Sequence, residues 1–120
     1  MSTVAVIGAS EKPARYSNRA IRMLQAHGHT PIPVSRTGKD VLGLKGYSSL
    51  RDVPERVDTV SMYLSAEKQA PVIQDILAVQ PRRVIFSPGA ENPGAYPGLA
   101  EQGIEVVEAC TLVLLSTGQF

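Results

Sequence analysis

The chain has little of several features that mark whole classes of proteins. It contains a single cysteine, Cys110, which excludes an internal disulfide framework. Its twelve basic and eleven acidic residues leave a net charge of +1, without the basic stripe that neutralises a nucleic-acid backbone. We therefore expect no nucleic-acid partner.

Long apolar segments are also missing. The N-terminus has neither a positively charged lead nor an apolar signal segment before Gly8. The longest apolar run near the other end, Leu112 to Leu115, is far too short to span a bilayer. These absences predict a soluble cytoplasmic protein in a reducing environment, with no membrane partner.

Metal ligands are scarce too. The only histidines, His27 and His29, flank Gly28 at a predicted helix end, and Cys110 is remote from them in the sequence. Solvated turn histidines are the simpler interpretation, so no metal site is predicted.

Five short apolar runs do recur along the chain, and they are continuous rather than alternating. Continuous runs are typical of strands buried on both faces of a sheet. Repeated strand, crossover, strand units predict an α/β protein with a doubly wound parallel sheet of about five strands, in one domain over residues 1–120. The runs are Thr3 to Ile7, Thr30 to Val34, Thr59 to Leu64, Arg83 to Ser87 and Ile104 to Val107.

Helices are expected between these runs. The segment Ser17 to Ala26 has an apolar face and is followed by Gly28 as a stop. A second helix is expected to contain Ile73 and Ile76, with Ser65 as a candidate cap and Glu67 in its first turn. Pro71 leaves the position of its first residue open, because proline beyond the first turn removes a helix hydrogen bond. Short helices are predicted at 49–53 and 99–102, whereas the prolines and glycines of 88–98 predict irregular structure.

The first strand runs into Gly8, Ala9 and Ser10, where a parallel sheet commonly meets phosphate at a helix N-terminus. Free backbone N–H groups and the positive helix end favour an anion there, and the guanidinium of Arg15 suits paired oxygens. The fingerprint G-x-G-x-x-G is absent, so the alternative is that Gly8 only turns the chain.

The end of the second strand indicates which nucleotide is bound. An NAD enzyme places a carboxylate there, whereas a phosphorylated ribose needs a cation. This chain offers Ser35, Arg36, Thr37 and Lys39 with no carboxylate at the tip. The ligand indicated is an adenosine with a ribose phosphate, which means NADP or coenzyme A.

Taken in order, several motifs together resemble the small single-domain CoA-binding proteins, a family similar to the CoA-binding domain of succinyl-CoA synthetase α-subunits. The resemblance spans essentially the whole length and implies a Rossmann-like fold with coenzyme A laid across the strand ends. The motifs are Val6-Ile-Gly-Ala-Ser10, Pro13-Ala-Arg-Tyr-Ser17, Leu42-Gly43, Val57-Asp-Thr-Val60, Pro88-Gly-Ala-Glu-Asn92 and Glu108-Ala-Cys110.

The resemblance also implies roles for individual residues. The diphosphate would lie at Gly8, Ala9 and Ser10, with Arg15, Tyr16 and Ser17 beside it. Ser35, Arg36 and Thr37 would meet the adenosine end, and Leu64, Ser65, Ser87, Pro88, Gly89 and Asn92 would line the pantetheine path. Many relatives carry an Asn-Pro-Lys-like turn after the second strand, so here the role of the lysine falls to Arg36 or Lys39.

No catalytic machinery is evident. Neither histidine lies in a loop at the strand tips, so neither suits the phosphorylatable histidine of synthetase-like reactions, and Glu91 and Asn92 are assigned structural or ligand-contact roles. Asp58 precedes the third strand, on the edge away from the ligand. Cys110 is either a small core residue or a thiol that forms a mixed disulfide with coenzyme A.

The leading hypothesis is therefore a non-enzymatic protein that binds coenzyme A or an acyl-CoA, with a regulatory or redox-linked role open. A small NADP-dependent reductase is one alternative. The other is a CoA-binding subunit that acts with a separate ligase-type partner. The sequence names no protein partner.

Overall fold

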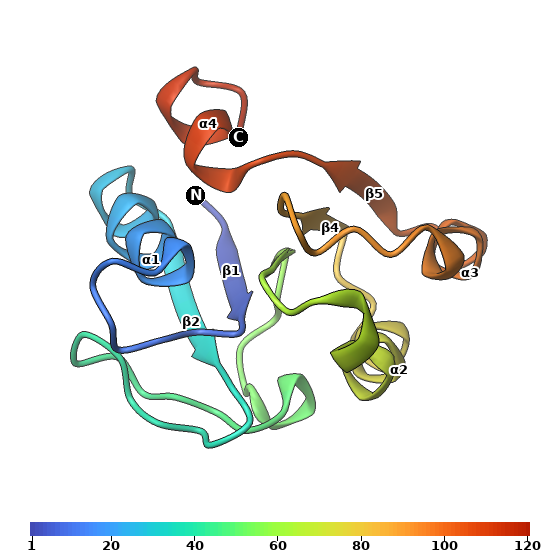
Figure 1. Cartoon of the computed structure of the whole chain (residues 1–120), viewed down its shortest axis with the longest axis horizontal. Helices are drawn as coiled ribbons and strands as arrows, with labels where there is room; N and C mark the ends of the chain where they lie inside the picture. Colours follow the sequence, from blue (N-terminus) through green and yellow to red (C-terminus); the bar gives the residue numbers. More distant parts are fainter.

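The five predicted strands form one sheet in a computed structural model that describes residues 1–120. Every neighbouring pair of strands is parallel, and the order across the sheet is β2-β1-β3-β4-β5. The prediction of a doubly wound parallel sheet of about five strands is thus confirmed (Figure 1). The strands are β1 (Thr3–Ile7), β2 (Thr30–Val34), β3 (Thr59–Met62), β4 (Arg83–Phe86) and β5 (Glu105–Glu108).

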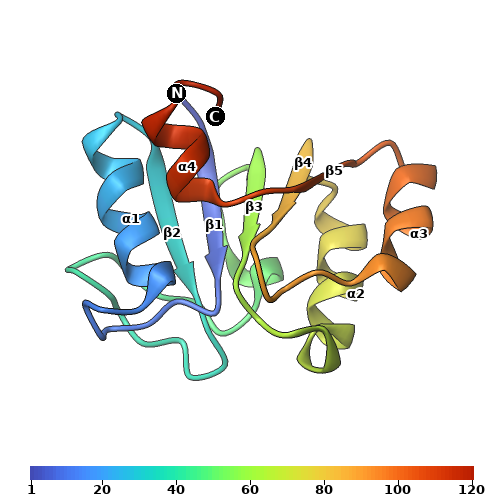
Figure 2. The same ribbon diagram turned by 45° about the horizontal axis from the view of Figure 1, so that its top comes forward.

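Helices cover both faces of the sheet, which makes the domain compact and Rossmann-like. One face carries α1 and α4, and the other carries α2 and α3 (Figure 2). The helices are α1 (Tyr16–Ala26), α2 (Ala70–Val79), α3 (Tyr96–Glu101) and α4 (Thr111–Ser116). Three 3₁₀ turns, Leu50–Asp52, Ala66–Lys68 and Pro93–Ala95, complete the regular structure.

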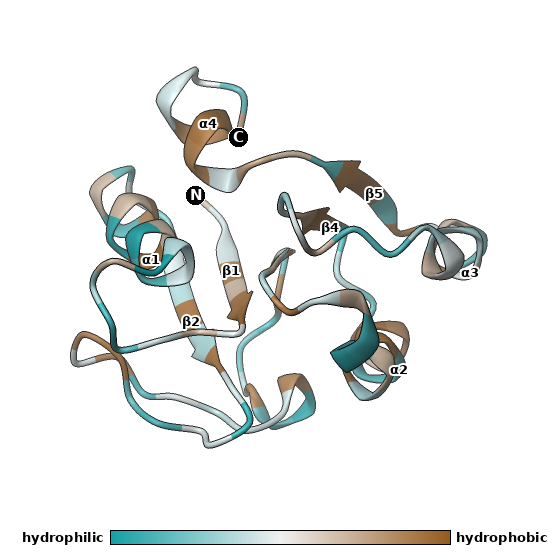
Figure 3. Cartoon of the chain, in the orientation of Figure 1, coloured by the Kyte–Doolittle hydropathy of each residue, from teal (hydrophilic) through white to brown (hydrophobic).

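Two apolar cores lie above and below the sheet because successive strand residues point to opposite faces. In β1, Ala5 and Ile7 join the core under α2 and α3, whereas Val4 and Val6 join the core under α1. All four side chains are at most 1% exposed, which explains why this strand reads as a continuous apolar run. The hydrophobic residues accordingly concentrate on the strands and on α4 (Figure 3).

The second helix begins later than the cap at Ser65 predicted. Ser65 precedes the 3₁₀ turn at Ala66–Lys68 and makes no side-chain capping hydrogen bond. Helix α2 itself begins at Ala70, with Pro71 in its first turn. Proline has no N–H to donate, and the first turn of a helix is where none is needed.

Two further predictions about helices were incomplete. Pro93 and Pro97 start the 3₁₀ turn Pro93–Ala95 and helix α3 instead of preventing regular structure, so α3 begins at Tyr96 rather than at Leu99. Helix α4 was not predicted, because six residues are too few to show a helical period. The short helix at 49–53 is confirmed as the 3₁₀ turn Leu50–Asp52, capped by the Ser49 hydroxyl.

Several of the predicted site residues lie just beyond the ends of β3 and β4, or on the segment that follows β5. Because β3 ends at Met62 and β4 at Phe86, Tyr63 and Ser87 are the first residues beyond the strands. After β5 the chain crosses the sheet face and brings α4 beside α1 (Figure 2). The carboxyl ends of β1, β3 and β4 therefore face a space bounded by α1 and α4.

The helices are all too short to cross a membrane. The longest helix, α1, has 11 residues, so none reaches the length and apolarity needed to cross a membrane.

Candidate functional site

The loop after β1 turns at Gly8, whose φ of +87° is a conformation that favours glycine. The N–H groups of Gly8 and Ala9 both donate to the carbonyl of Val34 at the end of β2, at 2.9 and 3.2 Å. These two donors are therefore used to join β1 to β2. The free N–H groups expected of this loop lie further along it.

The start of α1 supplies them. The N–H groups of Ser10, Tyr16, Ser17 and Asn18 donate to no protein acceptor. Arg15 occupies the N-cap position without a side-chain capping bond, and the first turn holds no acidic residue. Because unpaired N–H groups carry the positive end of the helix dipole, this terminus favours an anion.

Asn18 holds this loop in shape, and the sequence had not singled it out. Its side chain is 1% exposed and donates to the Ser10 carbonyl at 2.9 Å. Its oxygen accepts from Arg22 Nε at 3.0 Å, and Arg22 also reaches the Pro13 carbonyl at 2.7 Å. Side-chain hydrogen bonds thus close the loop from Ser10 to Asn18 from inside.

The cations named from the sequence differ in their partners. Arg15 and Arg36 are exposed and form no ion pair, whereas Lys39 lies 3.9 Å from Glu11, with both side chains more than half exposed. Ser35 and Thr37 approach each other through their hydroxyls at 3.4 Å, next to Arg36. Arg36 is therefore the unpaired cation at the end of β2.

A buried glutamine joins the loops after β3 and β4. Gln69 is 0% exposed, and its amide nitrogen donates to the carbonyls of Leu64 and Ala90 at 2.8 and 2.7 Å. Its oxygen accepts from the Asn92 side chain at 3.1 Å. Gln69 therefore sets the spacing between Leu64 and Ser65 on one side and the loop Pro88 to Asn92 on the other.

The loop after β4 is also stabilised from within. Glu91 accepts from the N–H of Gly89 at 2.8 Å, and Asn92 N–H donates to the Tyr96 hydroxyl at 3.2 Å. That hydroxyl donates to Glu108 at 2.7 Å, and burial together with this bond raises the pKa of Tyr96. Glu91 thus has a structural contact in this loop.

A cleft of about 390 Å³ opens where the ends of β3, β4 and β5 face α1 and α4. Four of the predicted residues, Tyr16, Ser87, Pro88 and Cys110, line it together. Cys110 is half-buried at the start of α4 and is not a core residue. The sequence analysis missed the other lining residues, Arg19, Tyr63, Leu112 and Val113.

The sequence indicated little about where these four residues lie. Tyr63 was predicted to lie inside the third strand, Thr59 to Leu64, so nothing in the sequence indicated that it lies just beyond the end of β3. Arg19 lay on the polar face of a helix predicted correctly. Leu112 and Val113 belong to the unpredicted α4, so nothing indicated their position.

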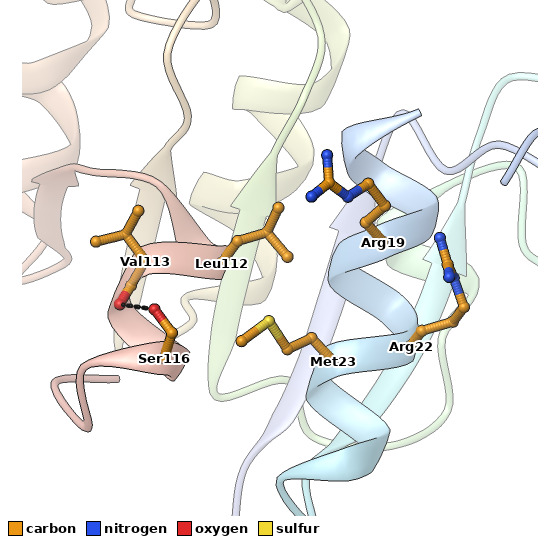
Figure 4. Close-up of a pocket in the computed structure, with 6 residues that line it drawn as sticks. All are labelled: Arg19, Arg22, Met23, Leu112, Val113 and Ser116. Carbon is orange, nitrogen blue, oxygen red and sulfur yellow. Dashed lines mark hydrogen bonds between the residues drawn. The ribbon is translucent and has the colours of Figure 1, made fainter. Parts of the chain in front are cut away.

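A second opening of about 470 Å³ continues from this cleft between α1 and α4. It shares Arg19, Leu112 and Val113 with the first, and Met23, Arg22 and Ser116 complete its lining. Arg19 extends into the gap and Met23 points across it toward α4, whereas Arg22 lies along the side of α1 (Figure 4). Because they share three lining residues, the two openings adjoin each other, and together they are called the depression below.

The remaining predicted residues lie outside this depression. Ser35, Arg36, Thr37 and Lys39 follow β2, which is separated from β3 by β1. Gly8 lies between the two groups: a β-carbon there would approach Tyr63 and Leu64 at 3.4 Å. Asp58 pairs with Arg82 at 3.1 Å at the opposite end of the strands, on the expected edge.

Comparison with known proteins gives consistent matches. Residues 2–116 match the model of a family described as CoA binding domain. The uncharacterized protein YneT of Bacillus subtilis is 31% identical over 104 residues, which are 87% of this chain and 77% of YneT.

Solved structures extend the comparison. A crystal structure of an uncharacterized protein has a TM-score of 0.94 and 42% identity, and the match covers 100% of this chain and 98% of that one. A dinucleotide-forming acetyl-coenzyme A synthetase from Ca. Korarchaeum cryptofilum, in complex with phosphate and ADP, has a TM-score of 0.75 and 25% identity. That match covers 90% of this chain but 25% of the synthetase.

Proposed function

This chain belongs to the family of CoA binding domains, and we propose that it binds coenzyme A across the carboxyl ends of β2, β1, β3 and β4. The observation that carries the proposal is the unpaired N-terminus of α1, where three consecutive N–H groups and that of Ser10 have no protein acceptor. The diphosphate of the coenzyme is the anion assigned to this position.

The extended shape of the ligand accounts for the separation of the predicted residues. With the diphosphate beside Ser10, Arg15, Tyr16 and Ser17, the adenosine lies toward β2 and the pantetheine arm toward β3 and β4. Gly8 supports this path because its φ of +87° favours glycine and leaves the space beside Tyr63 and Leu64, over which the arm crosses, free of a side chain.

Arg36 is assigned to the ribose 3′-phosphate because it is exposed at the end of β2 without a carboxylate partner. A charge-assisted hydrogen bond contributes about 1.5–3 kcal/mol, so coenzyme A binds roughly ten- to a hundredfold more tightly than dephospho-CoA. Replacing Arg36 with alanine removes most of this preference. Lys45→Ala, another exposed cation of the same segment, is the matched control and keeps it.

The pantetheine arm ends, in this proposal, in the cleft beside Cys110. The thiol of the coenzyme then lies near that of Cys110, which makes thiol–disulfide exchange with oxidised coenzyme A possible. The Cys110 thiolate attacks the disulfide of the CoA dimer, one coenzyme stays attached through a new disulfide, and the other leaves as a thiolate. The protein would thereby respond to the redox state of the coenzyme pool.

The direct test is to identify what the purified protein carries. Denaturing the protein and analysing the released small molecules by mass spectrometry is expected to yield coenzyme A or its thioesters. Release of NADP in their place would support the reductase alternative and contradict the proposal.

A second candidate role follows from the acetyl-coenzyme A synthetase match. Because this chain corresponds to 25% of that enzyme, it also fits a CoA-binding subunit that works with a separate ligase-type partner. Affinity purification of the tagged chain tests this role: a co-purifying ATP-dependent ligase subunit supports it, and a chain that purifies alone contradicts it.

A further inference from the structure

The loop between β1 and α1 is held from one side by two side chains of α1. Asn18 is 1% exposed, and its amide nitrogen donates to the carbonyl of Ser10 at 2.9 Å. Arg22, one turn further along α1, donates through Nη2 to the carbonyl of Pro13 at 2.7 Å. Its Nε donates to the Asn18 oxygen at 3.0 Å. The two side chains therefore bind each other and one loop carbonyl each.

These bonds fix the direction of two peptide groups. The chain has no cis peptide bond, and in a trans peptide the carbonyl and the following N–H point to opposite sides. Because the carbonyls of Ser10 and Pro13 are directed at side chains of α1, the next N–H groups along the chain are directed away from them. These N–H groups belong to Glu11 and Ala14, which are both exposed, and neither donates to a protein acceptor.

Such an arrangement suits an anion. Backbone N–H groups that point to one side of a loop form a concavity that binds anions, whereas a carbonyl oxygen turned to that side would repel them. The carbonyls of Lys12 and Arg15 are also paired, with backbone N–H groups further along the chain. The first turn of α1 adds the unpaired N–H groups of Tyr16 and Ser17.

We propose that Asn18 and Arg22 are positioning residues for the diphosphate of coenzyme A. By holding the two loop carbonyls, they present the N–H groups of Glu11 and Ala14 to that diphosphate. The inference rests on the proposed function, which places the diphosphate at the start of α1. It adds two donors to those assigned there and gives Arg22 a role that needs no contact with the ligand.

The positive charge of Arg22 can be separated from its role in the loop. Its guanidinium lies along the side of α1, engaged with Asn18 and Pro13 (Figure 4). Lysine keeps the charge, but it lacks the planar fork that holds two acceptors in fixed directions. Arg22→Lys therefore removes the positioning and keeps the attraction for an anion.

Titration calorimetry of the full chain with coenzyme A tests the proposal. Asn18→Ala and Arg22→Lys are each expected to weaken binding about five- to thirtyfold, the worth of one to two hydrogen bonds. The double variant is expected to lose no more than the larger single loss, because both residues act through one set of hydrogen bonds. Arg56→Ala removes an exposed cation before β3 and is the control that keeps the wild-type affinity.

Heteronuclear NMR of the isotope-labelled chain reads the loop directly, with inorganic pyrophosphate as the probe. In the wild type, pyrophosphate is expected to shift the amide resonances of Glu11 and Ala14 together with those of Tyr16 and Ser17. In Arg22→Lys the shift of Ala14 is lost, because the preceding carbonyl is no longer held, while that of Tyr16 remains. Loss of stability alone would not single out one amide in this way.

The outcomes distinguish the positioning role from the proposed function. If coenzyme A binds the wild type and Arg22→Lys keeps that affinity within about twofold, the positioning inference is overturned and the CoA proposal stands. The same holds if pyrophosphate shifts Tyr16 and Ser17 but leaves Glu11 and Ala14 in place. If the wild type binds no coenzyme A, the proposed function is overturned as well. Arg22 is exposed, so its variant decides the question even where Asn18→Ala does not fold.

Discussion

Replacing Gln69 with leucine tests whether one buried side chain sets the spacing of the two loops that would enclose the pantetheine arm. Leucine keeps most of the volume but removes the two hydrogen bonds to the carbonyls of Leu64 and Ala90 and the one from Asn92. Each is worth about 1 kcal/mol net, so we expect a loss of about 3 kcal/mol. A domain of this size has roughly 6–18 kcal/mol in total.

Differential scanning calorimetry measures the effect. For a domain of this length, about 3 kcal/mol corresponds to a fall in Tm of about 9–15 °C. Gln74→Leu on α2, the helix that Gln69 directly precedes, is the matched control, because Gln74 is exposed and its side chain makes no hydrogen bond. Its unfolding free energy is expected to change by less than about 0.5 kcal/mol. A Tm for Gln69→Leu within about 3 °C of the wild type, on the same scale, would refute the reasoning.

Three further predictions concern other parts of the chain. Gly8→Val is expected to abolish coenzyme A binding and to lower the free energy of unfolding by about 1–3 kcal/mol, because a φ of +87° strains a branched residue and the new side chain contacts Tyr63. If titration calorimetry gives the wild-type affinity for coenzyme A, this prediction is wrong. The pKa of His29 is lowered by burial and by the N-terminal amine, so the unfolded chain binds the proton more readily, and the free energy of unfolding falls as the pH drops below the ordinary pKa of histidine. Denaturant titrations from pH 7 to about 5 should show a smaller loss of unfolding free energy in His29→Gln than in the wild type or in the control His27→Gln. An equal loss in all three proteins would contradict this prediction. Oxidised coenzyme A should add one coenzyme to the intact mass of the wild type and none to Cys110→Ser, whereas an unmodified wild type would exclude the exchange.

The sequence was a good guide to the sheet because buried parallel strands have a local signature. The run at β1 is apolar on both faces, and β3 and β4 are buried on both faces although they include Thr59, Ser61 and Arg83, so all three could be recognised without knowing what covers them. Helix α1 was found for the same reason, from its own apolar face and the following Gly28. Helix α4 had too few residues for this, although its burial against α1 decides the shape of the cleft.

The candidate site was predicted less completely, because its key contacts join distant segments. Ser61, Ser87 and Thr111 belong to three separate elements, and only the crossing after β5 brings Thr111 to Ser61. Gln69 resembles any polar residue near a helix start until its carbonyl partners in two loops are known. The N–H groups of Gly8 and Ala9 were predicted to face a phosphate. The sequence could not reveal that both donate to the carbonyl of Val34, at the end of the neighbouring strand.

Titration calorimetry of the wild-type chain with coenzyme A and with NADP tests the central claim most directly. Both ligands carry a diphosphate and a phosphorylated adenosine ribose, so both can reach the start of α1 and Arg36, but only coenzyme A has the pantetheine arm that the path past Gly8, Leu64 and Ser87 would accommodate. The account predicts tighter binding of coenzyme A. Tighter binding of NADP would contradict it.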